Sequence, residues 1–344
     1  MQDINSLVRK NILSMLPYSS ARDEYTGKKG IFLDANENPF GRYNRYPDPK
    51  QQLVKKTLAN LKQVSEENIF LGNGSDEVID LLYRIFCEPG KDKVLTFSPT
   101  YGMYKVAAAI NDITLLEIPL DESFQINFDV AEEMIASESP KLLFICSPNN
   151  PTGNSLLNIE RLIKSFKGIV VIDEAYIDFS SQKSFIDVAL ALPNVVVMQT
   201  LSKAWGLAAA RVGMAFANPA LIALFNRVKP PYNISLLNQQ AAIEALQSIE
   251  TFETNKAIIL NERKRLEILL ESLPSVIKIY PSDANFILVA FNDADAIYNY
   301  LVQKEIITRN RHAVVKNAIR ITVGTSLEND TLVNALSNFQ LQAQ

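Results

Sequence analysis

Short apolar runs recur along the first two thirds of the chain, and helical spacing of apolar residues fills the stretches between them. The runs are KVLTF near Val94, LLFIC near Leu143, IVVID near Val171, VVVMQ near Val196 and VGMAFA near Val212. Runs that are apolar throughout are typical of strands buried on both faces of a parallel sheet. Their alternation with helices predicts an α/β fold with an open, mostly parallel sheet, which we assign to a large domain over residues 31–235.

The pattern changes after this domain. The segment VKPPYNIS, from Val228 to Ser235, carries two prolines and interrupts the alternation. A long charged helical stretch then runs through residues 261–271, and strands are expected around residues 277–280, 285–289 and 319–323. We therefore expect a smaller α+β domain over residues 236–344, joined by an amino-terminal arm of residues 1–30.

Composition and charge narrow the class of protein. With 344 residues, 47% of them hydrophobic, the chain is long enough for one large core and a smaller one. No apolar stretch approaches the roughly 20 residues that span a bilayer, and the amino terminus lacks the pattern of a signal peptide. A formal net charge of −4 without a dense basic tract gives no reason to expect nucleic-acid binding. We expect a soluble, cytoplasmic enzyme.

The cysteines and the histidine give no sign of a metal site. Cys87 and Cys146 both lie in apolar surroundings, which is typical of buried thiols and not of a disulfide pair. The single histidine, His312, lies among basic residues and is expected in a solvated loop.

The most informative short motif is TLSK, residues 200–203, which ends an apolar run and is followed by Arg211. A lysine in an apolar pocket beside another cation loses its proton more easily, and a neutral amine can form a Schiff base with an aldehyde. The hydroxyls of Thr200 and Ser202 and the guanidinium of Arg211 would suit a phosphate. The motif thus indicates a site for pyridoxal 5′-phosphate (PLP) at Lys203, with a solvated lysine at a strand end as the simpler alternative.

A second apolar run leads directly into Asp173, with Tyr176 three residues further on. Ligands gather at the carboxyl ends of buried parallel strands. A carboxylate there can keep the pyridinium nitrogen of PLP protonated, and Tyr176 can donate its hydroxyl to the phenolate oxygen of the ring. The alternative is an acidic helix start, which the helix dipole also favours.

Two polar turns complete the pattern. SPNNPTG follows the run near Leu143, and its Asn150 offers an amide hydrogen to the same phenolate oxygen, unless the segment is only a loop before a helix. In GNGSDE, Gly74 precedes Ser75 and Asp76 at the start of a helical pattern. Such a helix start can receive a phosphate, although Ser75 could equally be only an N-cap.

Taken together and in this order, these segments resemble the histidinol-phosphate aminotransferase family of fold-type I PLP-dependent aminotransferases. The resemblance covers nearly the whole chain. It is carried by LPYSSAR from Leu16, LDANENPFG from Leu33, NRYP from Asn44, GSDE, PTYGMY from Pro99, SPNNPTG, DEAYIDF, TLSKAWGL and AIRITVG from Ala318. It implies a large domain with a mixed, mostly parallel sheet between helices, a smaller α+β domain, and a homodimer.

For the cofactor, the resemblance implies that Lys203 forms the Schiff base with PLP and moves the proton, while Asp173 partners the ring nitrogen. It places Tyr176 and Asn150 beside the phenolate oxygen and Tyr101 against the ring. The residues that it implies at the phosphate are Ser75, Asp76, Thr200, Ser202 and Arg211, together with Tyr46 of the neighbouring subunit.

For the substrate, Arg320 in AIRITVG resembles the arginine that binds the substrate carboxylate, because a planar guanidinium fits a carboxylate with two hydrogen bonds. Arg309 matches the position expected to bind the substrate phosphate, with Tyr18 and Asn36 nearby. The chain departs from the family pattern in two places: Ala209-Ala210 stand where Gly-Leu is usual, and residues 309–316 lack the expected glycines.

The activity that the resemblance implies is ping-pong transamination between histidinol phosphate and 2-oxoglutarate, giving imidazole-acetol phosphate and glutamate in histidine biosynthesis. A threonine-phosphate decarboxylase and an aromatic amino acid aminotransferase remain alternatives on the same fold. A non-catalytic binding module is a further alternative, against which the intact Lys203, Asp173, Tyr176 and Arg211 argue. Neither a nucleic acid nor a membrane is expected as a partner.

Overall fold

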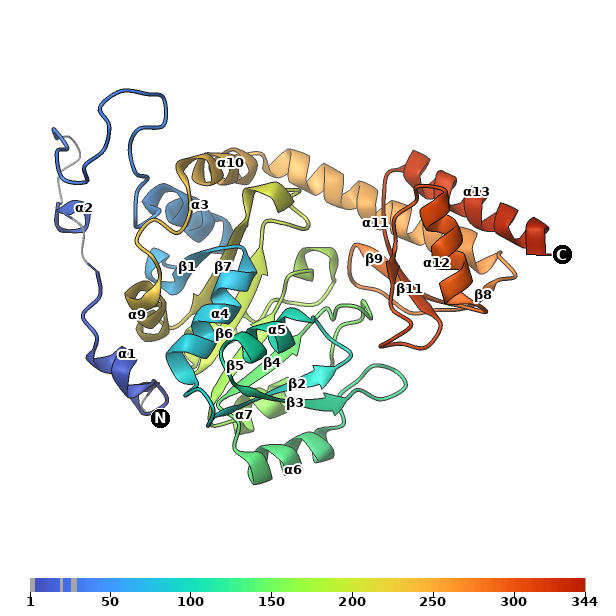
Figure 1. The fold of residues 1–344 in the computed structure, drawn as a ribbon, viewed down its shortest axis with the longest axis horizontal. Coiled ribbons are helices and arrows are strands. Elements are labelled where there is room, and N and C mark those ends of the chain that lie inside the picture. Colours follow the sequence, from blue (N-terminus) through green and yellow to red (C-terminus); the bar gives the residue numbers. More distant parts are fainter. Residues whose placement is uncertain (1–3, 19–20, 26–29, 344) are drawn as a thin grey trace.

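The computed structural model describes residues 4–18, 21–25 and 30–343. Within these residues the strands form a seven-stranded sheet and a four-stranded sheet, each covered by helices (Figure 1). We call the first sheet with its helices the large domain and the second the small domain.

The large sheet has the order β1-β7-β6-β5-β4-β2-β3, and β7 alone runs antiparallel to its neighbours β1 and β6. The predicted mixed, mostly parallel sheet is therefore confirmed. The strands are β1 (Ile69–Asn73), β2 (Lys93–Ser98), β3 (Thr114–Pro119), β4 (Leu142–Cys146), β5 (Ile169–Asp173), β6 (Val195–Thr200) and β7 (Val212–Ala217). All five predicted runs are strands of this sheet.

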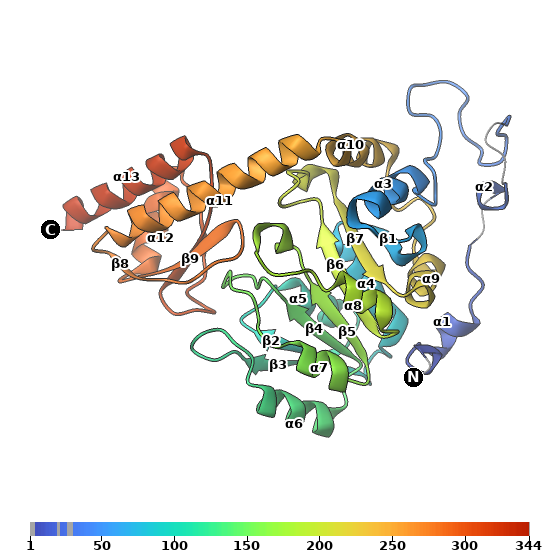
Figure 2. The ribbon, with the colours of Figure 1, turned by 180° about the vertical axis from the view of Figure 1, so that it is seen from behind.

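Helices cover both faces of the large sheet because its strands are apolar on both faces. Along β4, Leu142 and Phe144 face one apolar cluster while Leu143 and Ile145 face the other. Figure 1 shows α4 and α5 over one face, and Figure 2 shows α7 and α8 over the opposite face. The helices of this part are α1 (Lys10–Ser14), α2 (Ala21–Glu24), α3 (Gln52–Lys62), α4 (Ser75–Phe86), α5 (Met103–Ile110), α6 (Phe128–Glu138), α7 (Glu160–Ser165), α8 (Ile186–Ala191), α9 (Pro219–Val228) and α10 (Leu236–Gln247).

The small sheet is antiparallel throughout, in the order β10-β11-β9-β8. Its strands are β8 (Val276–Ile279), β9 (Phe286–Phe291), β10 (Arg309–Asn310) and β11 (Ala318–Thr322). The helices α11 (Ile249–Glu271), α12 (Ala294–Gln303) and α13 (Ser326–Ala343) bury an apolar cluster against it. Short 3₁₀ turns lie at Ile4–Ser6, Glu66–Asn68, Ile177–Phe179 and Ala208–Ala210.

The observed contacts differ from the predicted domain division in two places, the amino-terminal arm and the boundary at residue 235. The described part of the arm does not join the small domain: Leu7, Val8 and Ile12 are buried in a cluster of the large domain. Beyond the two prolines, α10 still contacts α3 and β7, because its Ala242 and Leu246 complete the core of the large domain. The chain crosses to the small domain along α11, as Figure 2 shows.

The cysteines are both free and buried, as predicted from their apolar neighbours. None of the helices in the described ranges combines the length and the apolar character needed to cross a membrane. Among the same residues, no group of three or more His, Cys, Asp and Glu side chains is placed to hold a metal ion.

The small domain allows a matched test of its core, because α13 carries both buried and exposed leucines. Leu336 is 0% exposed and Leu327 is 77% exposed. We expect Leu336→Ala to lower the free energy of unfolding by about 2–5 kcal/mol, since it removes buried methyl groups and leaves a cavity. Leu327→Ala should change it by less than about 0.5 kcal/mol. Urea denaturation followed by circular dichroism measures both, and equal midpoints would contradict the described packing of α13.

Candidate active site

A cavity of about 390 Å³ opens at the carboxyl ends of β4, β5 and β6, where loops of the large domain face β10 and β11. Ligands bind at this edge of open α/β sheets because the loops that follow neighbouring strands converge there. The residues that line the cavity are Ser75, Asp76, Tyr101, Cys146, Asn150, Asp173, Ala175, Tyr176, Thr200, Ser202, Lys203, Arg211, Arg309, Arg311 and Arg320.

Lys203 follows β6 and extends its side chain into this cavity. Its Nζ lies 5.6 Å from the centre of the Tyr176 ring. Partial burial of the ammonium group, and then the charges of Arg320 and Arg211, lower the pKa of Lys203, while Asp173 acts in the opposite direction. The lysine therefore yields a neutral amine at lower pH than an ordinary surface lysine does.

Asp173 is the last residue of β5 and only 2% exposed. One carboxylate oxygen accepts a hydrogen bond from the Ala175 amide at 3.1 Å, and the other accepts one from the Tyr104 hydroxyl at 2.6 Å. Burial raises the pKa of Asp173, and these two hydrogen bonds act against that increase. The result is a buried carboxylate held in a fixed direction, and no ion pair joins it to a cation in the described parts of the chain.

Tyr176 and Asn150 meet at the same end of the cavity. The Asn150 side-chain amide donates to the Tyr176 hydroxyl at 3.4 Å, and the Asn150 side-chain oxygen accepts a short hydrogen bond from Arg320. The amide and the hydroxyl predicted to flank one oxygen atom are thus adjacent in the structure, and Arg320 fixes the orientation of the amide.

The amino terminus of α4 forms the opposite end of the cavity. Gly74 has a φ of 74°, and a Cβ built on it would lie 2.5 Å from Nη2 of Arg211, so a side chain would be strained and crowded there. Gly213 on β7 packs as closely, since a Cβ on it would meet the Ser75 amide nitrogen at 2.2 Å. These close contacts bring the first amides of α4 beside Arg211, where an anion can bind.

Side chains around Arg211 add polar atoms to this end. Its guanidinium lies 3.3 Å from the Asp76 carboxylate and 3.5 Å from the Ser202 hydroxyl. The Ser202 amide in turn donates to the Thr200 hydroxyl at 3.1 Å, and the Tyr101 hydroxyl donates to Asp76 at 3.1 Å. The five residues predicted at a phosphate therefore form one cluster at the helix start.

Three sequence-predicted residues lie outside this cavity. Tyr18 lines a separate cavity beside Lys229, and Asn36 and Tyr46 line a third one. The Tyr46 ring stacks on Tyr232 with centroids 4.4 Å apart. The segment LPYSSAR includes residues 19 and 20, which lie outside the described residues.

The predicted substrate arginines line the cavity, although Arg309 lies in a stretch that lacks the usual glycines. The structure explains how the loop still turns: Asn317 has a φ of 57°, a conformation that asparagine adopts more readily than most residues with a side chain. The Arg311 amide then donates to the Ala318 carbonyl at 2.8 Å and continues the pairing of β10 with β11. His312 is exposed in this loop, as predicted.

Sequence reasoning missed two residues of this site. Tyr104 lies within PTYGMY, but only the fold shows that its buried hydroxyl reaches Asp173 across 69 positions of sequence. Arg311 stands two positions after Arg309, and residues two apart on a strand point to the same face of the sheet. This spacing could have predicted that Arg311 joins Arg309 in the site.

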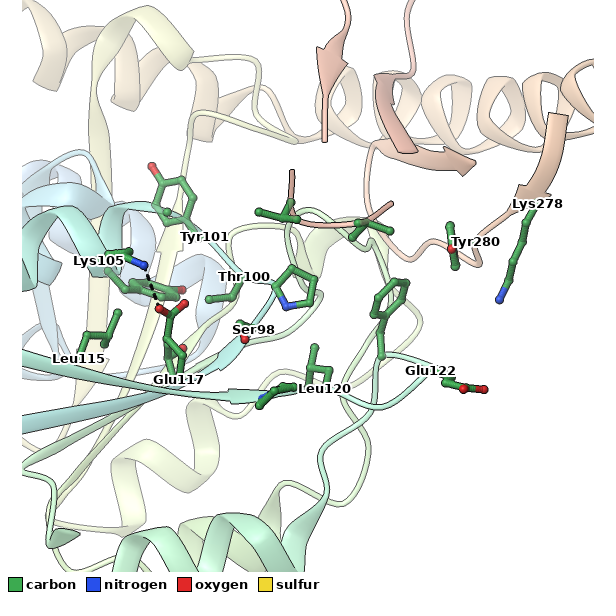
Figure 3. Close-up of a pocket in the computed structure, with 18 residues that line it drawn as sticks. Ser98, Thr100, Tyr101, Lys105, Leu115, Glu117, Leu120, Glu122, Lys278 and Tyr280 are labelled. Atoms are coloured by element: carbon green, nitrogen blue, oxygen red, sulfur yellow. Dashed lines mark hydrogen bonds and ion pairs between the residues drawn. The ribbon is translucent and has the colours of Figure 1, made fainter. Parts of the chain in front are cut away.

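A larger cavity, of about 790 Å³, lies nearby between the edge strand β3 and the small domain (Figure 3). Tyr101 lines both cavities. Two of its charged residues, Lys105 and Glu117, pair with each other at 3.1 Å. The larger cavity contains neither Lys203 nor Asp173, so the smaller cavity is the candidate active site.

Comparison with known proteins agrees with this geometry. Residues 26–336 match the family model described as "Aminotransferase class I and II". The histidinol-phosphate aminotransferase of Parabacteroides distasonis is 52% identical over 99% of this chain and 100% of its own length, and that of Cytophaga hutchinsonii is 49% identical over 98% and 99%. The crystal structure of the Sinorhizobium meliloti histidinol-phosphate aminotransferase in complex with pyridoxal-5′-phosphate has a TM-score of 0.80 at 25% identity and covers 90% of both chains. The chain therefore belongs to the class I and II aminotransferase family and, within it, groups with the histidinol-phosphate aminotransferases.

Proposed function

We propose that this chain is a PLP-dependent aminotransferase that exchanges an amino group between histidinol phosphate and 2-oxoglutarate. The products are imidazole-acetol phosphate and glutamate, and in the opposite direction the reaction serves histidine biosynthesis. The observation that carries the proposal is the single cavity that joins Lys203, Asp173 and an anion site at a helix start, in a chain that is 52% identical over its length to a histidinol-phosphate aminotransferase.

The residues present fit PLP from end to end. The first amides of α4, with Arg211 and Ser202, suit its phosphate, and the glycines at 74 and 213 let those amides lie close to Arg211. The Asp173 carboxylate suits a protonated ring nitrogen, and Lys203 supplies the amine that an aldehyde requires. When bound, PLP supplies an aldehyde carbon and a ring that accepts electrons.

Lys203 is the residue that we assign to proton transfer. Its lowered pKa favours a neutral Nζ, which can remove the proton from the substrate carbon that carries the amino group and would return it to the aldehyde carbon of bound PLP. The cations Arg320 and Arg211 favour this neutral form, so the same charges that bind anions also prepare the base.

Proton transfer by Lys203 depends on the charged and polar groups around it, and Asp173 and its neighbours supply these groups. Tyr104 donates to the Asp173 carboxylate, which favours its ionised form against the effect of burial and fixes its direction. Asn150 and Tyr176 offer two hydrogen-bond donors to a phenolate oxygen, and Arg320 is placed to bind a substrate anion beside them.

The first test is the reaction itself. We expect the PLP-loaded protein to convert histidinol phosphate and 2-oxoglutarate to glutamate and imidazole-acetol phosphate in a 1:1 ratio. Threonine phosphate supplied separately should release no CO₂, and tyrosine or phenylalanine should be used with a kcat/KM at least about 10-fold lower, because neither offers a phosphate. Release of CO₂ would support the decarboxylase alternative, and a preference for the aromatic amino acids would support the second alternative.

The control for this test is Lys203→Ala. Turnover should fall by more than about 1,000-fold, since the variant lacks both the amine and the base. Its circular dichroism and thermal midpoint should stay close to those of the wild type, because Lys203 packs in no apolar cluster of the described core. Substantial amino transfer by this variant would refute the assigned role.

Tyr104 provides a second prediction, on cofactor binding. Without its hydroxyl, the pKa of Asp173 rises further, so the carboxylate becomes protonated at higher pH. For Tyr104→Phe we expect about 10-fold weaker PLP binding near pH 7, and the acid-side loss of binding should begin at higher pH than in the wild type. Fluorescence titration of the apoprotein with PLP at several pH values measures both effects.

Tyr83→Phe is the matched control for that prediction. Tyr83 lies in the same aromatic stack and donates to the backbone carbonyl of Tyr104 at 2.9 Å, but it does not touch Asp173. It should reduce stability by about 1 kcal/mol without moving the pH dependence of PLP binding. An equal pH shift in the two variants would mean that Tyr104 acts only through packing.

The proposal includes a cytoplasmic homodimer in which Tyr46 acts across the interface. Its support is a segment with many exposed apolar side chains: Ile31 is 92%, Leu33 88% and Phe40 81% exposed. Residues 31–46 of this segment are held in place by Glu37, which accepts hydrogen bonds from Arg22 and Arg45 at 2.6 and 2.7 Å. An ordered segment with this much apolar surface is typical of a subunit interface.

Subunit mixing tests the role of Tyr46. If Tyr46 completes the partner's site, a hybrid of Lys203→Ala and Tyr46→Ala subunits carries both changes in one site and neither in the other. Mixing the two weakly active variants under exchange conditions should then restore about a quarter of wild-type activity. Activity that never exceeds the sum of the separate variants would place Tyr46 outside the partner's site.

A further inference from the structure

Three arginines lie on one face of the small sheet and point into the active-site cavity. Arg309 of β10 pairs directly with Arg320 of β11, so their side chains project from the same face. Arg311 lies two residues after Arg309, and its amide continues the ladder to the Ala318 carbonyl. Because side chains alternate along a strand, Arg311 joins the other two, and all three line the cavity.

The residue between them confirms this alternation. Asn310 points to the opposite side, where its amide donates to Asp295 on α12 at 2.6 Å. The clustering of the three guanidinium groups therefore follows from the strand geometry of this segment.

The three charges are not compensated by the protein. In the described part of the chain, no carboxylate forms an ion pair with Arg309, Arg311 or Arg320, and Nε of both Arg311 and Arg320 is buried without a hydrogen-bond partner. Burial, and then the charges of Arg320 and Arg309, lower the pKa of Arg311. Like charges placed opposite each other destabilise a sheet. Because a bound anion offsets this repulsion, the cluster is suited to receive one.

The number of guanidinium groups bears on which anion this is. A carboxylate presents two oxygens in one plane, and a single guanidinium satisfies it with two hydrogen bonds. A phosphate monoester presents three terminal oxygens in a pyramid and carries a charge of about −1.5 to −2 near pH 7. It therefore accepts hydrogen bonds from more than one planar donor.

Resting on the proposed function, we propose that Arg311 is a specificity-determining residue, which binds the substrate phosphate together with Arg309 and Arg320 and is dispensable for the carboxylate substrates. Arg320, held by Asn150, serves the anion of both half-reactions. Arg311 adds the donors that only the phosphate uses, so it separates the phosphorylated substrate from glutamate and 2-oxoglutarate in one shared cavity.

The test compares Arg311→Gln with the wild type in the PLP-loaded enzyme. We expect KM for histidinol phosphate to rise about 10- to 100-fold, the value of a lost charge-assisted hydrogen bond, while KM for glutamate and 2-oxoglutarate changes less than about threefold. Glycerol 3-phosphate, which cannot react, should show the same loss as a competitive inhibitor. The thermal midpoint should stay at or above that of the wild type, because the change removes repulsion between like charges.

Lys316→Gln is the matched control, since it removes one positive charge from an exposed position of the same loop outside the cavity. It should leave all three constants within about twofold. Equal increases of KM for phosphate and carboxylate substrates, no change in either, or a large drop in the thermal midpoint would each overturn the proposal. If the wild type does not use histidinol phosphate, the proposed function fails, whereas the inhibition by glycerol 3-phosphate still tests Arg311 separately.

Discussion

The active site depends on a buried carboxylate with which no cation of the described residues is directly paired. Asp173 is 2% exposed, and its contacts are an amide and a phenol, both neutral. Burying an ionised group without a counter-charge is costly, so the carboxylate must be held by hydrogen bonds and completed by a positive group when the cavity is filled. The ring stack of Tyr104 on Phe144, with centroids 4.6 Å apart, places the phenol in the core and fixes that hydrogen bond.

The rest of the cavity is organised by charge around this carboxylate. Asp76 already compensates Arg211 at the helix start, while the arginines of the small sheet have no such partner. This arrangement would offer opposite charge to a cofactor with a phosphate at one end and a cationic ring nitrogen, and then to an anionic substrate. Burial and, after it, the same positive charges lower the pKa of Lys203, so the groups that attract anions also favour the neutral amine.

The sequence predicted the parts of the site that follow from strand order, and it missed the parts that depend on packing. Lys203, Asp173 and Asn150 each come after an apolar run, and the carboxyl ends of neighbouring strands necessarily meet. The strands β1 and β3 were not predicted: the first leads directly into α4, and the second is an edge strand whose exposed positions obscure the apolar pattern.

Tyr104 was missed because the direction of a buried hydroxyl is set by its neighbours and not by its own segment. Tyr18, Asn36 and Tyr46 lie away from the cavity of their own chain, and no local pattern distinguishes a residue that serves its own site from one that faces another surface.

One loop links the two domains at the point where the chemistry takes place. Asn150 lies in the turn after β4, and the same turn contains Gly153, whose carbonyl accepts a hydrogen bond from the Asp283 amide at 2.7 Å. The Asp283 carboxylate accepts in return from the Ser155 hydroxyl at 2.6 Å, and a Cβ on Gly153 would meet Ser282 at 2.6 Å. The small domain is thus anchored three to five residues from the amide that orients Arg320. Because Arg320 belongs to the small sheet and Asn150 to the large domain, this contact helps to keep the anion site aligned with the amide next to Tyr176. The turn therefore has to satisfy both the geometry of the site and the seating of the small domain, which explains why it combines a left-handed glycine with side chains that are almost entirely buried.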